Sequence, residues 1–203
     1  MFPRVLVTRS GGRSTRAPPR CGSWLRLAAD YPPTMRPDPE HPAVAAARST
    51  IEPGRPMEVR AFATREPAPA AAVLLSDDRN CRAVIVEKRS GVWTPPTMLS
   101  ESGWHPHNRP EKTVAPWALG QGATSQSGLP RADGSPPVDA WTTFTGLAAP
   151  DALSVLVRSE LDEHEVPVGP DGVVLALLRA SWHGRLEIVV RTADGDVVRT
   201  TPS

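Results

Sequence analysis

Two histidines and a glutamate stand close together in the middle of the chain and have the side chains of a metal site. His105 and His107 are two residues apart in the stretch SGWHPHNRPE (102–111), which ends on Glu111. Residues two apart on a β-strand share a face, so both imidazoles would point the same way. Two nitrogens and a carboxylate suit Zn, Fe, Mn or Ni. The sequence therefore offers His105, His107 and Glu111 as candidate ligands of a divalent transition metal.

This stretch resembles the first motif of the cupin family, in which a glycine precedes His-x-His and a glutamate follows a few residues later. The resemblance implies a metal held inside a barrel, with another histidine supplied by a later motif. Two features depart from the family pattern. Pro106 and Pro110 interrupt a segment that is a regular strand in cupins, and no histidine follows Pro170-Asp171-Gly172 at the family's spacing. The competing interpretation is a rigid loop whose imidazoles make hydrogen bonds near Trp104.

A second polar cluster, Asp162-Glu163-His164-Glu165, combines carboxylates with an imidazole. Such a group could serve acid–base catalysis or supply a further metal ligand. The favoured interpretation is a solvated hairpin tip between two strands. His183 is likewise interpreted as part of a turn, and Cys81, which begins an expected strand beside Arg82, as a small buried thiol.

Other catalytic motifs do not occur. No serine lies in a Gly-x-Ser-x-Gly pattern, and the pair Gly120-Gln-Gly122 lacks the Lys-Ser/Thr of a phosphate-binding loop. The sequence thus favours a protein that is not an enzyme and carries no cofactor, with the metal site as the alternative.

The elements that must position these residues are strands. Short apolar runs separated by turn residues predict strands at 71–76, 82–88, 92–93, 152–159, 165–168, 173–178, 186–192 and 197–201. Between them, residues 97–140 contain six prolines from Pro106 to Pro137 and are predicted to form a long irregular loop region. This spacing predicts an all-β fold, an immunoglobulin-like β-sandwich or alternatively a small β-barrel.

The span from Phe144 to Val198 resembles small immunoglobulin-like modules in uncharacterised actinobacterial proteins. The resemblance is carried by Thr145-Gly146-Leu147, the run from Val166 to Gly172, and Ala193-Asp194-Gly195. It implies a sandwich fold and no catalytic residues. The Cys…Trp…Cys pattern of antibody domains is absent.

Residues 1–70 are predicted to be a disordered Pro/Arg-rich segment, ahead of a β-rich domain over 71–203. Half of the 24 prolines fall before residue 70, and proline disrupts both helices and ladders. Two exceptions are a short Ala-rich helix at 42–49 and a candidate edge strand with Val59, Ala61 and Ala63. Residues 1–34 hold six arginines and one acid, and are interpreted as disordered or as not translated, with Met35 as the start.

Charge and cysteine usage bound the partners and the compartment. Residues 1–65 carry eleven arginines and five acids, a net of +6, and the remainder carries a net of −5. An acidic domain gives no reason to expect nucleic acid or an anionic membrane as partner, whereas a protein partner stays open. No apolar run approaches the ~18 residues of a membrane helix. Two cysteines cannot make a disulfide framework, so we expect a reducing, cytoplasmic location. Arginine outnumbers lysine 21 to 2, which indicates a GC-rich bacterial gene.

These observations favour a non-enzymatic interaction or accessory module, with a cupin-like metal enzyme or metal sensor as the alternative. Metal analysis of protein purified without an affinity tag separates the two hypotheses. Stoichiometric metal that disappears in His105→Ala and His107→Ala would establish the alternative.

We predict that residues 1–34 are dispensable for folding, because they offer no periodic apolar face that could offset their ordering entropy. A chain that starts at Met35 should melt within about a degree of the full chain in calorimetry. A melting temperature lower by several degrees would contradict this prediction.

Overall fold

The computed structural model describes residues 38–65, 70–95, 99–100, 109–114 and 119–200. Every described residue belongs to one compact unit, which lies within Pro32–Ser203. The segment before residue 38, which was predicted to be disordered, lies outside the described residues. The elements are α1 (Pro42–Arg48), β1 (Glu58–Arg65), β2 (Ala70–Ser76), β3 (Cys81–Arg89), β4 (Val92–Thr94), β5 (Leu99–Ser100), β6 (Leu119–Ser127), β7 (Asp139–Ala148), β8 (Ala152–Arg158), β9 (Glu163–Pro167), β10 (Val173–Ser181), β11 (Glu187–Thr192) and β12 (Gly195–Thr200).

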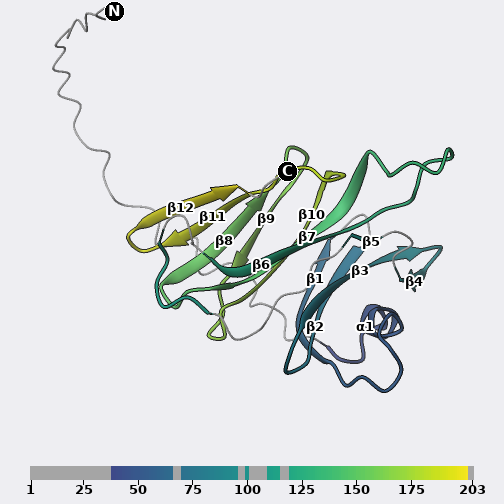
Figure 1. Ribbon diagram of the computed structural model, residues 1–203, viewed down its shortest axis with the longest axis horizontal. Helices are drawn as coiled ribbons and strands as arrows, with labels where there is room; N and C mark the ends of the chain where they lie inside the picture. The colour runs from purple at the N-terminus through teal and green to yellow at the C-terminus, as the bar shows by residue number, and fades with distance from the viewer. Residues whose placement is uncertain (1–37, 66–69, 96–98, 101–108, 115–118, 201–203) are drawn as a thin grey trace, which may run out of the picture. The chain divides into compact units, whose positions relative to one another are not determined.

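The strands form three antiparallel sheets of four strands each (Figure 1). The order is β1-β2-β3-β4 in what we call the helix-covered sheet, β10-β7-β6-β5 in the central sheet, and β12-β11-β8-β9 in the C-terminal sheet. Every sheet has two edge strands and none closes on itself within the described ranges. The predicted all-β sandwich is therefore confirmed, and the small-barrel alternative is wrong for this part of the chain.

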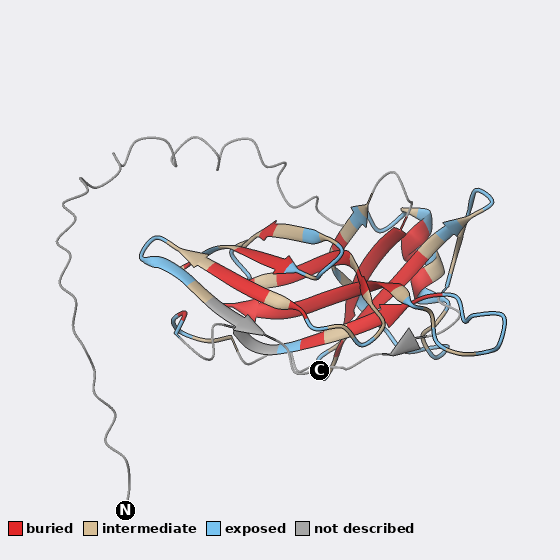
Figure 2. Ribbon diagram, turned by 90° about the horizontal axis from the view of Figure 1, so that it is seen from above, coloured by how far each residue is buried: buried red, intermediate tan, exposed pale blue. Residues whose placement is uncertain are grey.

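Three apolar clusters show how the layers are stacked. Helix α1 packs on one face of the helix-covered sheet, and the other face of that sheet packs on the central sheet. The opposite face of the central sheet packs on the C-terminal sheet. Strands β2, β7 and β10 are therefore covered on both faces and are buried along nearly their whole length (Figure 2). Burial on both faces explains why β2 and most of β10 are continuous apolar runs rather than alternating ones. Strand β7 is buried as well, although its sequence includes three threonines.

Two predicted hairpins, β2–β3 and β11–β12, are confirmed, and in each the residues of the turn bond to one another. Between β2 and β3, Asp77 Oδ1 accepts hydrogen bonds from the N–H groups of Arg79 (2.9 Å) and Asn80 (2.8 Å). These bonds stabilise the ionised carboxylate and lower the pKa of Asp77 to about 2. Between β11 and β12, Thr192 pairs with Gly195, whose φ of 136° is open to glycine. Each turn thus fixes the register of its hairpin.

The expectation of a long irregular region over 97–140 is wrong at residues 119–127, which form strand β6. One of its turn-forming residues is explained by the close approach of the neighbouring strand β7. A Cβ added at Gly122 would lie 3.1 Å from the Phe144 ring and 3.2 Å from the carbonyl oxygen of Thr145. A small residue is therefore required at this place in a strand, although the same residue types are typical of loops.

The predicted boundary at residue 70 is too late, because α1 and β1 belong to the fold. The helix is too short to be stable alone in water. It is stabilised by burying Ala43, Val44 and Ala47, all 0% exposed, against the helix-covered sheet. His41 caps it, with Nδ1 accepting a hydrogen bond from Ala43 N–H at 3.1 Å. The candidate edge strand is confirmed as β1, which pairs with β2 at the sheet edge.

We predict that truncating the helix contact destabilises the whole domain. Val44→Ala should lower the free energy of unfolding by about 2 kcal/mol, because it removes two buried methyl groups and leaves a cavity. Ala45→Ser, on the exposed side of the same helix, should change it by less than about 0.5 kcal/mol. Urea denaturation measures both, and equal stability of the two variants would contradict the inclusion of α1 in the core.

Candidate functional site: a side-chain ladder along strand β10

Strand β10 is an edge strand of the central sheet that lies against the other two sheets. An edge strand presents N–H and C=O groups without a neighbouring strand. In β10 the N–H groups of Leu177, Arg179 and Ser181 are on the side away from β7, as alternation in an antiparallel pair requires. These donors are partly enclosed, so each needs an acceptor other than water.

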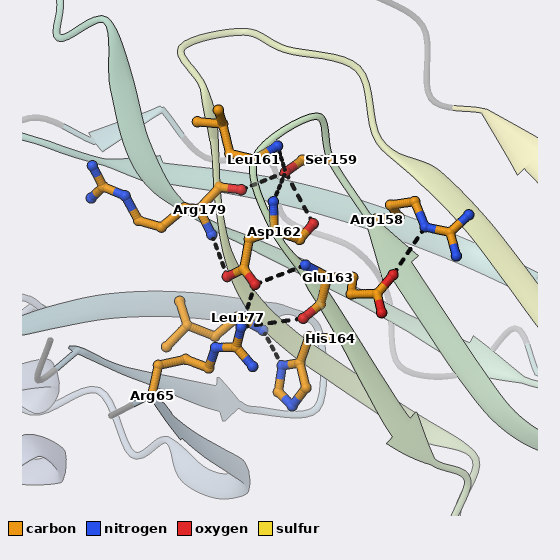
Figure 3. Close-up of polar contacts among 9 residues, drawn as sticks. All are labelled: Arg65, Arg158, Ser159, Leu161, Asp162, Glu163, His164, Leu177 and Arg179. Carbon is orange, nitrogen blue, oxygen red and sulfur yellow. Dashed lines mark hydrogen bonds and ion pairs between the residues drawn. The ribbon is translucent and has the colours of Figure 1, made fainter. Parts of the chain in front are cut away.

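Side chains of the β8–β9 connection and of the start of β9 supply those acceptors in register. Leu177 N–H donates to His164 Nδ1 (2.9 Å), Arg179 N–H to Asp162 Oδ2 (3.1 Å), and Ser181 N–H to Glu160 Oε1 (2.8 Å). Every step of two residues along the connection is matched by a step of two residues back along β10. We call this row of three bonds the side-chain ladder; Figure 3 shows its Asp162 and His164 bonds.

Ser159 shapes the turn from which the ladder starts. Its Oγ accepts hydrogen bonds from the N–H groups of Leu161 and Asp162, both at 3.0 Å. The hydroxyl also donates to the carbonyl oxygen of Arg179 at 2.5 Å (Figure 3). The turn is therefore bound to β10 by its side chains, through the Ser159 hydroxyl and the Asp162 carboxylate.

The predicted solvated hairpin tip over Asp162–Glu165 is wrong, because β9 begins at Glu163 and the turn lies before it. Alternation along β9 divides the cluster between two environments. Asp162 and His164 face β10, whereas Glu163 and Glu165 make ion pairs with Arg158 and Arg191. The signal that could have revealed the ladder is the placement of acceptors at the alternate positions 160, 162 and 164.

Arg65 at the end of β1 connects the helix-covered sheet to the side-chain ladder at Asp162. Its guanidinium lies 2.5 Å from Asp162 Oδ1 and also donates to the carbonyl oxygen of Glu163 at 3.2 Å. Partial burial acts to raise the pKa of Asp162, but hydrogen bonds from Arg179 N–H and Arg65 outweigh it and hold the pKa below its ordinary value. Asp162 is therefore ionised and bonded to two strands of two different sheets.

His164 is held in its neutral form. Burial lowers the pKa of His164, and the nearby Arg65 guanidinium lowers it further. The N–H of Leu177 also favours the neutral ring, because only an unprotonated Nδ1 can accept that hydrogen bond. The ring proton therefore resides on Nε2.

Ser159, Asp162 and His164 are the residue types of a hydrolase triad, but their bonds serve the backbone. A triad needs the histidine to accept the serine proton and to donate its other N–H to the carboxylate. Here the Ser159 hydroxyl donates to Arg179 O, and His164 Nδ1 is an acceptor. This arrangement holds strands together and does not activate a nucleophile.

The candidate metal ligands are only partly visible in the structure. His105 and His107 lie outside the described residues, and Glu111 is exposed in a bend. Between His107 and Glu111, Arg109 anchors the chain by donating hydrogen bonds to the carbonyl oxygens of Ala148 (2.9 Å) and Pro170 (2.6 Å). Within the described ranges, no three His, Cys, Asp or Glu side chains form a metal-binding group. The site at His105, His107 and Glu111 stays a prediction.

Two other sequence candidates have structural places. His183 lies in the turn after β10 with a φ of 60°, and its ring contacts Trp182 edge-on. Cys81 is a buried free thiol at the start of β3, and burial raises its pKa. A thiol held in its protonated form is a poor nucleophile.

The loops at the ladder end of the sandwich are bonded to one another. Gln126 is buried, and its amide bonds to Thr142 Oγ1 (3.0 Å), to Ser181 O (3.1 Å) and to His183 N–H (2.8 Å). Trp182 N–H donates to Val138 O at 3.0 Å. The β6–β7 loop, the β8–β9 turn and the β10–β11 turn therefore meet at one end, which we call the loop end.

The comparisons with known proteins give no relative for this chain. No protein-family model, no curated protein and no solved structure matches it. Across the described ranges, no helix is long and apolar enough to cross a membrane.

We predict that the ladder stabilises the domain more than the ion pairs beside it. Asp162→Ala should lower the free energy of unfolding by about 2 kcal/mol, because Arg179 N–H and Arg65 lose their acceptor in an enclosed place. Glu163→Ala is the matched control, since it removes a neighbouring carboxylate from an exposed ion pair and should cost less than about 0.5 kcal/mol. Equal costs in urea denaturation would show that the ladder is not a stabilising feature.

Proposed function

We propose that this chain is a non-enzymatic module that binds another protein through the loop end. One observation carries the proposal. Leu129, Val138 and Leu161 are 56%, 69% and 53% exposed, and all three lie in loops that the hydrogen bonds described above hold together. Large apolar side chains exposed on loops that are bonded to one another are a feature of protein interfaces.

The chemistry of the ladder supports binding rather than catalysis. Ser159, Asp162 and His164 are the residues with the strongest catalytic potential in the described part of the chain, and each is bonded to backbone. Preorganised loops lower the entropy cost of association, because they do not have to be ordered when the partner binds. The loop end has this character, since buried Gln126 fixes the turn that carries His183.

The β6–β7 loop supports the same proposal. It reaches beyond the strands that it joins (Figure 1) and is closed by bonds between Arg131 and Ser135 (2.9 Å) and between Gly134 and Arg131 (2.8 Å). Pro136 and Pro137 stiffen its return and offer no N–H to another strand. The loop is thus a preformed projection rather than an open edge.

The immunoglobulin-like character of residues 144–198 and a reducing, cytoplasmic location are part of this proposal. The first is supported by the antiparallel sandwich whose loops gather at its ends, as immunoglobulin-like domains present their binding loops. The second is supported by the free buried thiol of Cys81.

The test is site-specific photo-crosslinking in the cells from which the gene comes. A photoreactive residue placed at Leu129 or at Leu161 should capture a protein that is not captured from Leu153, which is 61% exposed at the start of β8. With the captured protein purified, Leu161→Ser should weaken its binding at least about tenfold in calorimetry, as expected for an apolar anchor. Leu153→Ser should leave the affinity unchanged. Capture from all positions alike, or equal affinities, would overturn the proposal.

A further inference from the structure

The side-chain ladder differs from a strand pairing in the chemistry of its acceptors. Backbone carbonyl oxygens, which accept hydrogen bonds in an ordinary sheet, do not titrate. In the ladder all three acceptors titrate: the carboxylates of Glu160 and Asp162 and the imidazole of His164. Acid can therefore break the hydrogen bonds of the side-chain ladder by protonating their acceptors, whereas it cannot do so in a ladder of backbone bonds.

We propose that the ladder is an acid-operated latch, in which protonation of His164 releases the start of β9 from β10 and exposes the edge of β10 at Leu177. An imidazolium has two N–H groups and no acceptor. Leu177 N–H donates to Nδ1 at 2.9 Å when the ring is neutral. After protonation Nδ1 carries a proton too, so two donors face each other and the hydrogen bond is lost. The first bond to break is the one furthest along β9 from the turn.

The charges that face His164 come from two elements. Arg65 on β1 carries a guanidinium close enough to disfavour the imidazolium, and Asp162 on the hairpin itself acts in the opposite sense. Asp162 is already bonded to Arg65 at 2.5 Å, so much of its charge is compensated there. Protonation therefore places a second cation beside Arg65 in a partly buried site.

The other packed elements add no charge directed at the ring. On β8, the residue paired with His164 is Val157. On β10, the side chain of Arg179 forms an ion pair with Asp139 and lies over the Trp141 ring. On β9 itself, Glu165 points to the opposite face, where it accepts from Ser154 Oγ at 2.6 Å. Apart from Asp162, the described carboxylates of these elements are thus bonded elsewhere.

The direction of the pH dependence follows from the lowered pKa of His164. Burial of the ring has the largest effect in lowering this pKa, and the positive charge of Arg65 has the next largest. A histidine whose pKa is lower in the closed state binds its proton more tightly in the open state. The latch is therefore fully closed above the ordinary value of 6.5, and it loses stability as the pH falls from there through the lowered pKa.

The carboxylates release later than the histidine. Hydrogen bonding from Ser181 lowers the pKa of Glu160, and the pKa of Asp162 is likewise below its ordinary value of 3.8. Both remain ionised acceptors in mild acid. The latch thus opens from the His164 end at mildly acidic pH, while the turn at Ser159 stays attached.

Amide hydrogen exchange of the full chain, followed by NMR between pH 8 and pH 5 and corrected for intrinsic rates, tests the proposal. Protection of the Leu177 amide should fall by up to about tenfold for each pH unit below about 6.5, because one proton is taken up on opening. Protection of amides in β7, in the same sheet, should stay level over this range. Protection of Leu177 that stays level as well would overturn the proposal.

His164→Asn is the matched variant, because the asparagine Oδ1 can accept from Leu177 N–H at the place of Nδ1 and does not titrate. Its protection at Leu177 should be independent of pH, whereas His164→Ala should be unprotected throughout. An identical pH profile in the wild type and His164→Asn would assign the effect to another group. If His164→Asn does not fold, the imidazole ¹⁵N shifts of the wild type decide: they must show an unprotonated Nδ1 at pH 8 and titrate together with Leu177 protection, and independent titration would overturn the latch.

Discussion

An edge strand placed in the interior is the constraint on which the rest of this structure depends. Strand β10 ends the central sheet, but it is covered on both faces and lies where all three sheets come together. Its outward N–H groups would cost free energy if they were enclosed without acceptors. The side-chain ladder supplies those acceptors and so removes that cost. Arg65 of β1 forms an ion pair with Asp162 of the ladder and so connects β1 to it. Three sheets that share no backbone pairing are thereby joined through one strand.

The ladder also determines what the polar residues of this chain can do. A serine, an aspartate and a histidine within six residues could form a catalytic group or a structural one, and their hydrogen-bond partners decide between the two. Ser159, Asp162 and His164 bond to the backbone of β10. Apolar side chains on the loops, such as Leu129 and Leu161, are exposed. These three polar groups therefore serve the structure, and the interaction that we propose rests on the exposed apolar groups.

Some elements could not be assigned from residue types because packing selected those types for a different reason. Strand β6 has the composition of a loop, yet Gly122 is needed there because Phe144 and the backbone of β7 approach closely. Helix α1 is too short to be stable on its own, yet Val44 is fully buried under the helix-covered sheet. In both cases the free energy that decides the conformation comes from a neighbouring layer, which a local pattern does not contain.

The sequence by itself determined the all-β class, because short apolar runs between turn residues are a local pattern. It also determined the hairpins β2–β3 and β11–β12 and the turn at His183, because these turns rest on bonds between residues two or three apart. Asp77 and Asn80 are a typical case. Only the tertiary structure decided the ladder, since its bonds join residues 13 to 21 apart and the ion pair of Arg65 with Asp162 spans 97 residues. Alternating acceptors at 160, 162 and 164 were present in the sequence. Their role depended on an unpaired strand edge that is placed beside them only when three sheets pack together.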